Sequence, residues 1–221
     1  MRHLDLTDGS VLLRPPGVAD VDAITLACQD PEIARWVPVP QPYGVQDARG
    51  FLANVVEPGW EGGTELTWGV REPDGALLGM VGLHRIEQRT AEIGFWLAPW
   101  ARHRGVMSRA VTLVLDHALD PDGLDLLRVT WRAVVGNWPS RRVAWRAGFR
   151  VEGTLRAELV HRDGVRRDAW VGTVLRGDQR APNEPWPRET STSDTATSGT
   201  STTGTSTTEP PSRPDTERIP A

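Results

Sequence analysis

Two Asp-Gly pairs constrain the fold of this chain more than any other feature of its sequence. Asp74-Gly75 and Asp163-Gly164 each lie between two strand-like segments. An Asp-Gly pair in this position is typical of the tight turn of a β-hairpin, which joins neighbouring antiparallel strands. The sequence therefore predicts antiparallel pairs and argues against a doubly wound fold, in which parallel strands and helices alternate strictly.

Apolar periodicity assigns the rest of the chain to short elements around these hairpins. The expected strands cover 11–15, 65–73, 76–87, 91–99, 125–135, 150–160 and 165–175. The expected helices cover 21–30, 46–56, 105–119 and 138–147. The proline-broken segment 31–44 is expected to be a loop, and the glycine-rich stretch 57–64 a turn. The order β-α-α-β-β-β-α-β-α-β-β predicts an α/β protein of the α+β type, with a mixed sheet and helices on its faces.

Residues of the capping type mark two helix starts. Asp20 is expected to cap the helix that begins at about residue 21, and Asn137 the helix that follows it. Pro139 lies in the first turn of that later helix, where a missing N–H is harmless, and Gly148 ends it.

Composition excludes several kinds of chemistry. All 25 basic side chains are arginine, so neither a Schiff-base lysine nor the lysine of a phosphate-binding P-loop is available. The single cysteine, Cys28, rules out an internal disulfide and falls on the apolar face of the first helix, which favours a buried hydrophobe. The five histidines are scattered without metal-ligand spacing, so no metal site is expected.

The chain divides into a domain, 1–177, and a tail, 178–221. The tail is rich in threonine, serine and proline, and it is expected to be disordered because it has almost nothing apolar to bury. Of the net charge of −4, the tail carries −3, from four arginines and seven acids, and the domain carries −1. A nearly neutral domain is a poor partner for nucleic acid.

No stretch reaches the roughly 18 apolar residues of a membrane span, and the start lacks the apolar run of a signal peptide, so a cytoplasmic protein with no membrane partner is expected.

The junction between strand 91–99 and helix 105–119 concentrates positive charge. Arg102 and Arg104 come just before the helix, and Gly105 would let a ligand approach the backbone. A helix start carries unpaired N–H groups and a partial positive charge, which favours an anion. The alternative is a turn whose arginines reach only into water.

Three segments together resemble the GNAT superfamily of N-acetyltransferases, in its RimJ/RimL-like branch. They are AEIGFWLAPWARHRGVMSRAV, NWPSRRVAWRAGFRVEG and DGVRRDAWVGTVLR, and the resemblance covers about 8–176. It implies the acyl-CoA N-acyltransferase fold, with acetyl-CoA as acyl donor and its pyrophosphate on the amides of 102–107. The cofactor-binding residues it implies are Phe95, Trp96, Leu97, Arg102, His103, Arg104, Gly105, Val106, Met107, Ser108 and Asn137. Met107 departs from the family pattern, which has a small residue there.

The resemblance also implies catalytic roles. Glu92 matches a glutamate that deprotonates the acceptor amine; the alternative is an ion pair with an arginine such as Arg85 or Arg132. Ser140 matches a serine that protonates the leaving thiolate; the alternative is a hydroxyl that bonds to the backbone at a helix start. Some members of the RimL-like branch also have an acid on their sixth strand, and Glu158 lies near the matching place. A register shift of one residue would move Glu158 to the other face of the sheet, so it is not included among the expected catalytic residues.

The acceptor is expected over the loop that holds Trp36 and Tyr43, near the turn 161–167. The predicted function is transfer of an acetyl group from acetyl-CoA to a primary amine by direct attack in a ternary complex. The amine is either a protein N-terminal α-amine, for example of a ribosomal protein, or that of a small molecule. The alternative is a non-catalytic acyl-CoA-binding or sensing module, and either a monomer or a homodimer is compatible with the sequence.

Overall fold

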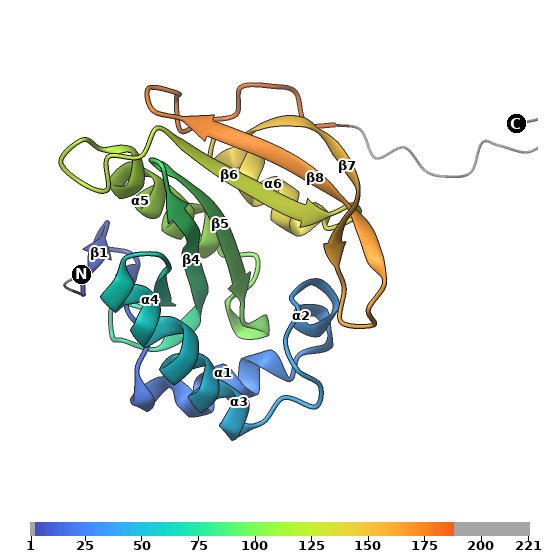
Figure 1. Ribbon diagram of the computed structural model, residues 1–221. Coiled ribbons are helices and arrows are strands. Elements are labelled where there is room, and N and C mark those ends of the chain that lie inside the picture. Colours follow the sequence, from blue (N-terminus) through green and yellow to red (C-terminus); the bar gives the residue numbers. More distant parts are fainter. Residues whose placement is uncertain (1–2, 188–221) are drawn as a thin grey trace, which may run out of the picture. The chain divides into compact units, whose positions relative to one another are not determined.

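Strands β1 to β8 form one sheet in the computed structural model, which describes residues 3–187 (Figure 1). The sheet order is β1-β2-β3-β4-β5-β6-β8-β7. The bounds are β1 (Leu6–Thr7), β2 (Leu12–Arg14), β3 (Leu66–Arg71), β4 (Leu77–Glu87), β5 (Thr90–Leu97), β6 (Arg128–Val134), β7 (Arg150–Val160) and β8 (Arg166–Leu175). Every neighbouring pair is antiparallel except β5 and β6, which are parallel. The predicted hairpins join β3 to β4 and β7 to β8, so the mixed sheet is confirmed.

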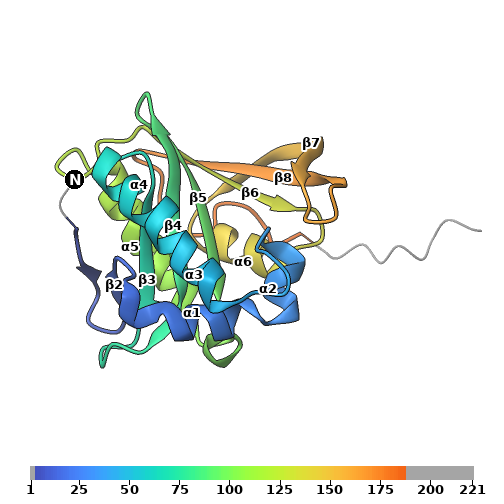
Figure 2. The ribbon, with the colours of Figure 1, turned by 60° about the horizontal axis from the view of Figure 1, so that its bottom comes forward.

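Helices cover both faces of this sheet. Their bounds are η1 (Val18–Asp20), α1 (Val21–Cys28), α2 (Pro31–Trp36), α3 (Val45–Phe51), η2 (Leu52–Val56), α4 (Glu57–Gly62), η3 (Pro99–Ala101), α5 (Val106–Leu119) and α6 (Trp138–Arg146). The first group, α1, α3 and α4, covers one face, whereas α5 lies behind β3 and β4 on the other (Figure 2). Helix α6 packs under β6. The eight residues between β5 and α5, 98–105, connect the sheet to the helix on this face, which places a loop at the end of the sheet.

Apolar side chains from both layers form the core. Trp68 on β3 is fully buried and meets Trp60 of α4 edge to face, with 5.1 Å between ring centroids. The Trp60 indole N–H donates to the Thr67 carbonyl at 3.0 Å, so the ring is buried without an unpaired donor. On the opposite face Val111, Val114 and Leu115 of α5 are fully buried, as the predicted apolar stripe requires.

Two segments expected to be irregular are helical. The prediction of a loop at 31–44 is wrong for its first part, since α2 begins at Pro31 after Asp30, whose side chain accepts a hydrogen bond from the Ile33 N–H at 3.0 Å. Proline is tolerated there because the first turn of a helix needs no N–H. The glycine-rich stretch 57–64 continues the preceding helix instead of turning, and the helix ends only at Gly63, whose φ is +65°.

Asp20 has a different role from the helix cap expected of it. Its carboxylate accepts from the Gly17 N–H at 2.8 Å and pairs with Arg71 through both oxygens, at 2.8 and 2.7 Å. Both side chains are only 10% exposed. The pair ties the start of α1 to the end of β3.

Residues 178–186, assigned to the tail from the sequence, pack against α6. The Trp186 ring meets Trp145 at 5.4 Å, and the Trp145 indole donates to the Glu184 carbonyl at 2.7 Å. The side-chain amide of Asn183 donates to the Gly148 carbonyl at 2.8 Å. The compact unit therefore extends to Trp186. The threonine-rich stretch 190–208 lies outside the described residues.

Candidate active site

Strands β5 and β6 separate at the centre of the sheet. On one side β5 pairs with β4 along its whole length, up to Leu97. On the other side it pairs with β6 only as far as Ile93, opposite Trp131 (Figure 1). The edge of β5 from Gly94 to Leu97 therefore has no strand partner on the β6 side. The Leu97 carbonyl accepts from Arg102 at 3.5 Å, and the other backbone groups that face this side can pair with an extended ligand.

The loop that follows β5 is held by two arginine–carboxylate pairs. Arg102 donates to Asp30 at 2.6 Å, and Arg104 pairs with Glu72 at 2.5 Å. Burial alone would raise the pKa of the Asp30 carboxyl, but the hydrogen bonds from Arg102 and the Ile33 N–H outweigh it and hold that pKa below its usual range. Both arginines thus brace the loop, and an anion at this corner would depend mainly on backbone donors.

Those donors lie at the start of α5. Gly105 precedes the helix with φ of +73°, and no side chain caps it. In the described part of the chain the N–H groups of Val106, Met107 and Ser108 have no hydrogen-bond partner. Met107 is 3% exposed and belongs to the apolar core, so its side chain does not stand over the start of the helix. This arrangement suits a diphosphate better than the sequence departure at Met107 implied.

Helix α6 brings Ser140 to the point where the strands separate. Asn137 caps the helix as predicted, accepting from the Ser140 N–H at 3.2 Å. The Ser140 hydroxyl has no hydrogen bond to the backbone of residues 3–187. It accepts from the indole N–H of Trp131 at 3.0 Å. Since the oxygen is held by this donor, its own hydrogen is free to be donated elsewhere.

Glu92 forms both of the ion pairs that were the alternative to catalysis. Its Oε2 atom lies 3.0 Å from Arg85 and 3.2 Å from Arg132, and Arg132 lies 3.3 Å from Glu158. Glu158 reaches this face because β7 bulges between Leu155 and Leu159. We call Arg85, Glu92, Arg132 and Glu158 the polar network.

The two residues expected to contact the acceptor lie in different settings. Trp36, at the end of α2, faces the turn between β6 and α6, near Gly136. The Tyr43 side chain is 6% exposed and hydrogen-bonds Cys28 inside the core. Burial, with Cys28 beside it, raises the pKa of Tyr43, and burial raises that of Cys28 to about 11. Trp36 therefore faces the site, and the Tyr43 side chain does not.

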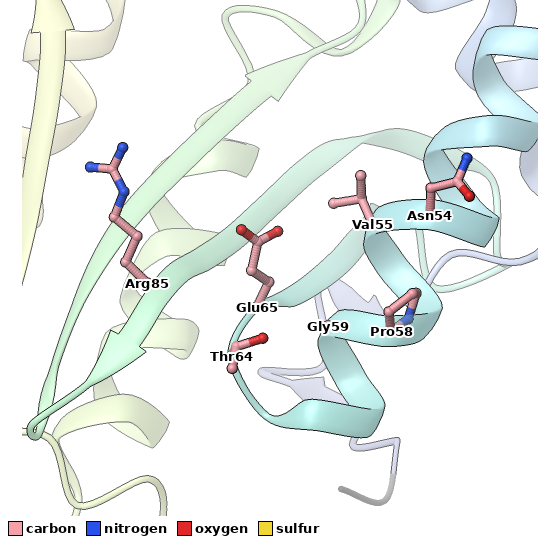
Figure 3. A pocket seen from close by; sticks show the side chains of 7 residues that line it. All are labelled: Asn54, Val55, Pro58, Gly59, Thr64, Glu65 and Arg85. Atoms are coloured by element: carbon pink, nitrogen blue, oxygen red, sulfur yellow. The ribbon is translucent and has the colours of Figure 1, made fainter.

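A shallow cavity of about 360 Å³ lies between the helical layer and the end of β4. Asn54, Val55 and Pro58 line its helical side, while Arg85 lies across from them on β4 (Figure 3). The Glu65 side chain stands between these two walls, and the Arg85 guanidinium points away from the helix, toward the polar network. The cavity thus lies on the Glu92 side of the separated strands.

Residues 3–187 contain neither a cluster of metal-ligand side chains nor a helix that could cross a membrane. No group of three or more histidine, cysteine, aspartate or glutamate side chains there could hold a metal ion. No helix among the described residues has the length and apolarity needed to cross a membrane.

Comparison with known proteins decides the family. The model of the GNAT acetyltransferase domain matches residues 10–150 of this chain, which is more than half of its length. The chain belongs to the GNAT acetyltransferase family. The resemblance seen in its sequence is thereby confirmed, and so is the acyl-CoA N-acyltransferase fold.

Individual GNAT relatives are more distant. YdaF of Bacillus subtilis (strain 168), provisionally named a ribosomal N-acetyltransferase, is 39% identical over 105 residues, which are 47% of this chain and 56% of YdaF. The match thus spans little more than half of that relative. A crystal structure of a probable acetyltransferase has a TM-score of 0.71 at 26% identity, with 80% of this chain and 99% of that one covered. RimJ of Mycobacterium smegmatis, solved with CoA-disulfide, has a TM-score of 0.69 at 24% identity. That match covers 78% of this chain and 86% of the RimJ chain.

The GNAT fold brings most of the predicted residues to one place. Phe95, Trp96 and Leu97 lie on the unpaired edge of β5, the loop 102–108 lies at its end, and Asn137 and Ser140 start the facing helix. Sequence reasoning missed His84, which lies directly opposite Glu92 on β4. In the sequence, the one hint of this position was that Gly82 and His84 alternate with apolar residues, which puts them on the same face of a strand. An ordinary buried strand gives the same pattern, so it did not single out His84.

Proposed function

We propose that this GNAT protein transfers an acetyl group from acetyl-CoA to a primary amine by direct attack in a ternary complex. One observation carries the proposal: the unpaired edge of β5 runs from free helix N–H groups at one end to ionisable side chains at the other. A thioester held along that edge would present its carbonyl carbon between the two, with the amine arriving from the polar side.

The donor side relies on the backbone. The diphosphate of acetyl-CoA rests on the N–H groups of Val106, Met107 and Ser108, and the pantetheine arm pairs with the open edge of β5 as an added strand would. Arg102 and Arg104 were also expected to bind the cofactor. Each already pairs with a carboxylate of the protein, and both shape this loop. A RimJ protein of the same fold is solved in complex with CoA-disulfide, which supports CoA as the carrier of the acyl group.

Transfer moves two protons. The amine nitrogen forms a bond to the thioester carbon and loses a proton to a base, for which Glu92 is the candidate from the sequence. The C–S bond then breaks, and the thiolate takes the hydroxyl proton of Ser140, which regains one from water. The hydrogen bond from Trp131 supports this role, because it fixes the Ser140 oxygen and stabilises negative charge on it.

The acceptor amine belongs either to a protein N-terminus or to a small molecule. The ribosomal name of YdaF favours a protein terminus, and so does the shallow cavity, which is open enough for a chain end. Trp36 at the edge of α2 would then contact the residues that follow the amine.

Thiol release from acetyl-CoA, measured against a panel of N-terminal peptides and small amines, tests the function. Ser140→Ala should lower kcat about 10- to 100-fold, while calorimetry shows unchanged acetyl-CoA affinity. Thr112→Ala on α5, which removes a hydroxyl bonded to the Ser108 carbonyl, serves as the control and should keep the wild-type rate. Binding without thiol release for every amine would favour the acyl-CoA sensing alternative, and no binding at all would reject both.

A further inference from the structure

The His84 ring packs over two glycine residues beside the point where β5 and β6 separate. Gly82 and Gly94 are cross-strand partners on β4 and β5. A Cβ built on Gly94 would lie 3.2 Å from Nε2 of His84, and one built on Gly82 would lie 3.3 Å from both Nε2 and Cε1. The imidazole therefore occupies the space that side chains at these two positions would fill.

This position puts Nε2 next to the open edge of β5. Gly94 is the first β5 residue beyond the last pair with β6. The Nε2 atom has no hydrogen-bond partner among residues 3–187, and the side chain is 38% exposed, so solvent and a ligand can reach it. The register break that follows His84 on β4, where Arg85 has φ of +52°, turns Arg85 toward Glu92 and away from the ring.

The other ring nitrogen faces a carboxylate. Nδ1 of His84 lies 3.8 Å from Oε2 of Glu65, within ion-pair range. A carboxylate on the Nδ1 side favours the tautomer with a proton on Nδ1, which leaves the Nε2 lone pair directed to the opening.

Glu92 is less available for the same task. Its Oε2 atom already accepts from one arginine and lies close to a second. An ammonium group that approached this oxygen would compete with two cations and be repelled by them. Glu92 is the cross-strand partner of His84, and Arg85 and Arg132 both pair with Glu92. Among residues 3–187, the charged side chain within ion-pair range of the ring is Glu65, just before β3.

We propose that His84, oriented by Glu65, is the catalytic residue that accepts the proton of the attacking amine. The inference rests on the proposed transferase function. As the amine nitrogen bonds to the thioester carbon, its proton passes to Nε2; the thiolate leaves with the proton of Ser140, and the imidazolium releases its proton to solvent. Glu92 then holds Arg132 and Arg85 in place and is not the base.

The test compares His84→Gln and His84→Ala with Glu92→Gln in the thiol-release assay. Both His84 variants should lose about 100-fold or more in kcat, the size typical of general-base catalysis, with acetyl-CoA affinity within twofold of wild type by calorimetry. Glu92→Gln should lose less than 10-fold. His117→Gln, near the far end of α5, is the matched control and should keep the full rate.

Rescue separates catalysis from a structural role. Added imidazole should restore part of the rate of His84→Ala in a saturable way, and it should not affect Glu92→Gln. Glu65→Gln should lower kcat about 10-fold with little change in KM. A Glu92→Gln variant without activity, beside His84 variants within threefold of wild type, would overturn the inference and leave the transferase function standing. A wild type that releases no thiol with any amine would overturn both.

Discussion

Two clusters of arginine and carboxylate side chains in this protein have the same chemistry and opposite surroundings. The Asp20–Arg71 pair joins α1 to β3, and each side chain is 10% exposed. In the polar network Glu92, Arg132 and Glu158 are 22%, 26% and 31% exposed. The buried pair has bidentate geometry, whereas Arg132 uses a single nitrogen, Nη1, for both of its carboxylates.

The difference shows what burial does to an ion pair. A buried charge that loses its partner has no water to replace it, so each member of the Asp20–Arg71 pair depends on the other. A partly exposed charge can turn to solvent, so the polar network adds little to stability. It can instead rearrange when a charged substrate arrives, which suits side chains beside a reaction centre.

Asp20→Ala should have the largest effect. It leaves the Arg71 guanidinium buried and unpaired and should lower the free energy of unfolding by about 3–5 kcal/mol. Urea denaturation followed by tryptophan fluorescence would measure it. Asp22→Ala, an exposed acid two residues along the same helix, should cost less than about 1 kcal/mol.

A double variant sharpens this prediction. Asp20→Leu combined with Arg71→Met removes both charges, so most of the loss should be recovered, because an apolar pair of similar size has no desolvation penalty. A double variant as unstable as Asp20→Ala would show that shape, and not the unpaired charge, causes the loss.

Much of the fold could be predicted because its signals are local. The Asp74-Gly75 turn, the apolar stripe of α5, and the Asn137 cap with Gly148 at the end of α6 each depend on a few neighbouring residues. Helix α2 was missed because the prolines after it outweighed the helix-start signal of Asp30 and Pro31. Helix α4 was missed because its glycines and Pro58 suggested a turn, whereas the backbone stays helical from α3 through η2 into α4.

The site was only partly predictable, because its essential contacts join distant segments. The end of β5–β6 pairing at Ile93 depends on how two strands diverge, which no local pattern encodes. The His84 position depends on a glycine ten residues away on the next strand. Family resemblance supplied Glu92 and Ser140, but the hydrogen bond from Trp131 and the two arginines on Glu92 appear only in three dimensions.

Acid should remove part of what Asp20 contributes. Burial alone would raise the pKa of Asp20, but the hydrogen bonds from Arg71 and the Gly17 N–H outweigh it, and the net pKa is lowered. A lowered folded pKa means that the stabilisation is complete above the ordinary value of 3.8 and is lost as the pH falls through the folded value.

Urea denaturation of wild type and Asp20→Asn between pH 7 and pH 2.5 would test this. The difference in unfolding free energy between them should be constant above about pH 5, where carboxylates are ionised in both states, and shrink below pH 4. A difference that stays constant down to pH 2.5 would show that the Asp20 charge does not contribute.

Arg132→Met should have the smallest effect and completes the comparison, because Arg71→Met is its matched partner. Without Arg132, Glu92 keeps Arg85 and Glu158 can turn to water, so the unfolding free energy should fall by less than about 1 kcal/mol. Arg71→Met should cost about 3–5 kcal/mol, since Asp20 cannot escape. In 1 M NaCl the Debye length is about 3 Å, so the small effect of Arg132→Met should vanish while that of Arg71→Met persists. Equal losses for the two variants would mean that the polar network holds the fold together as the buried pair does, and its side chains would then not be free to rearrange around a substrate.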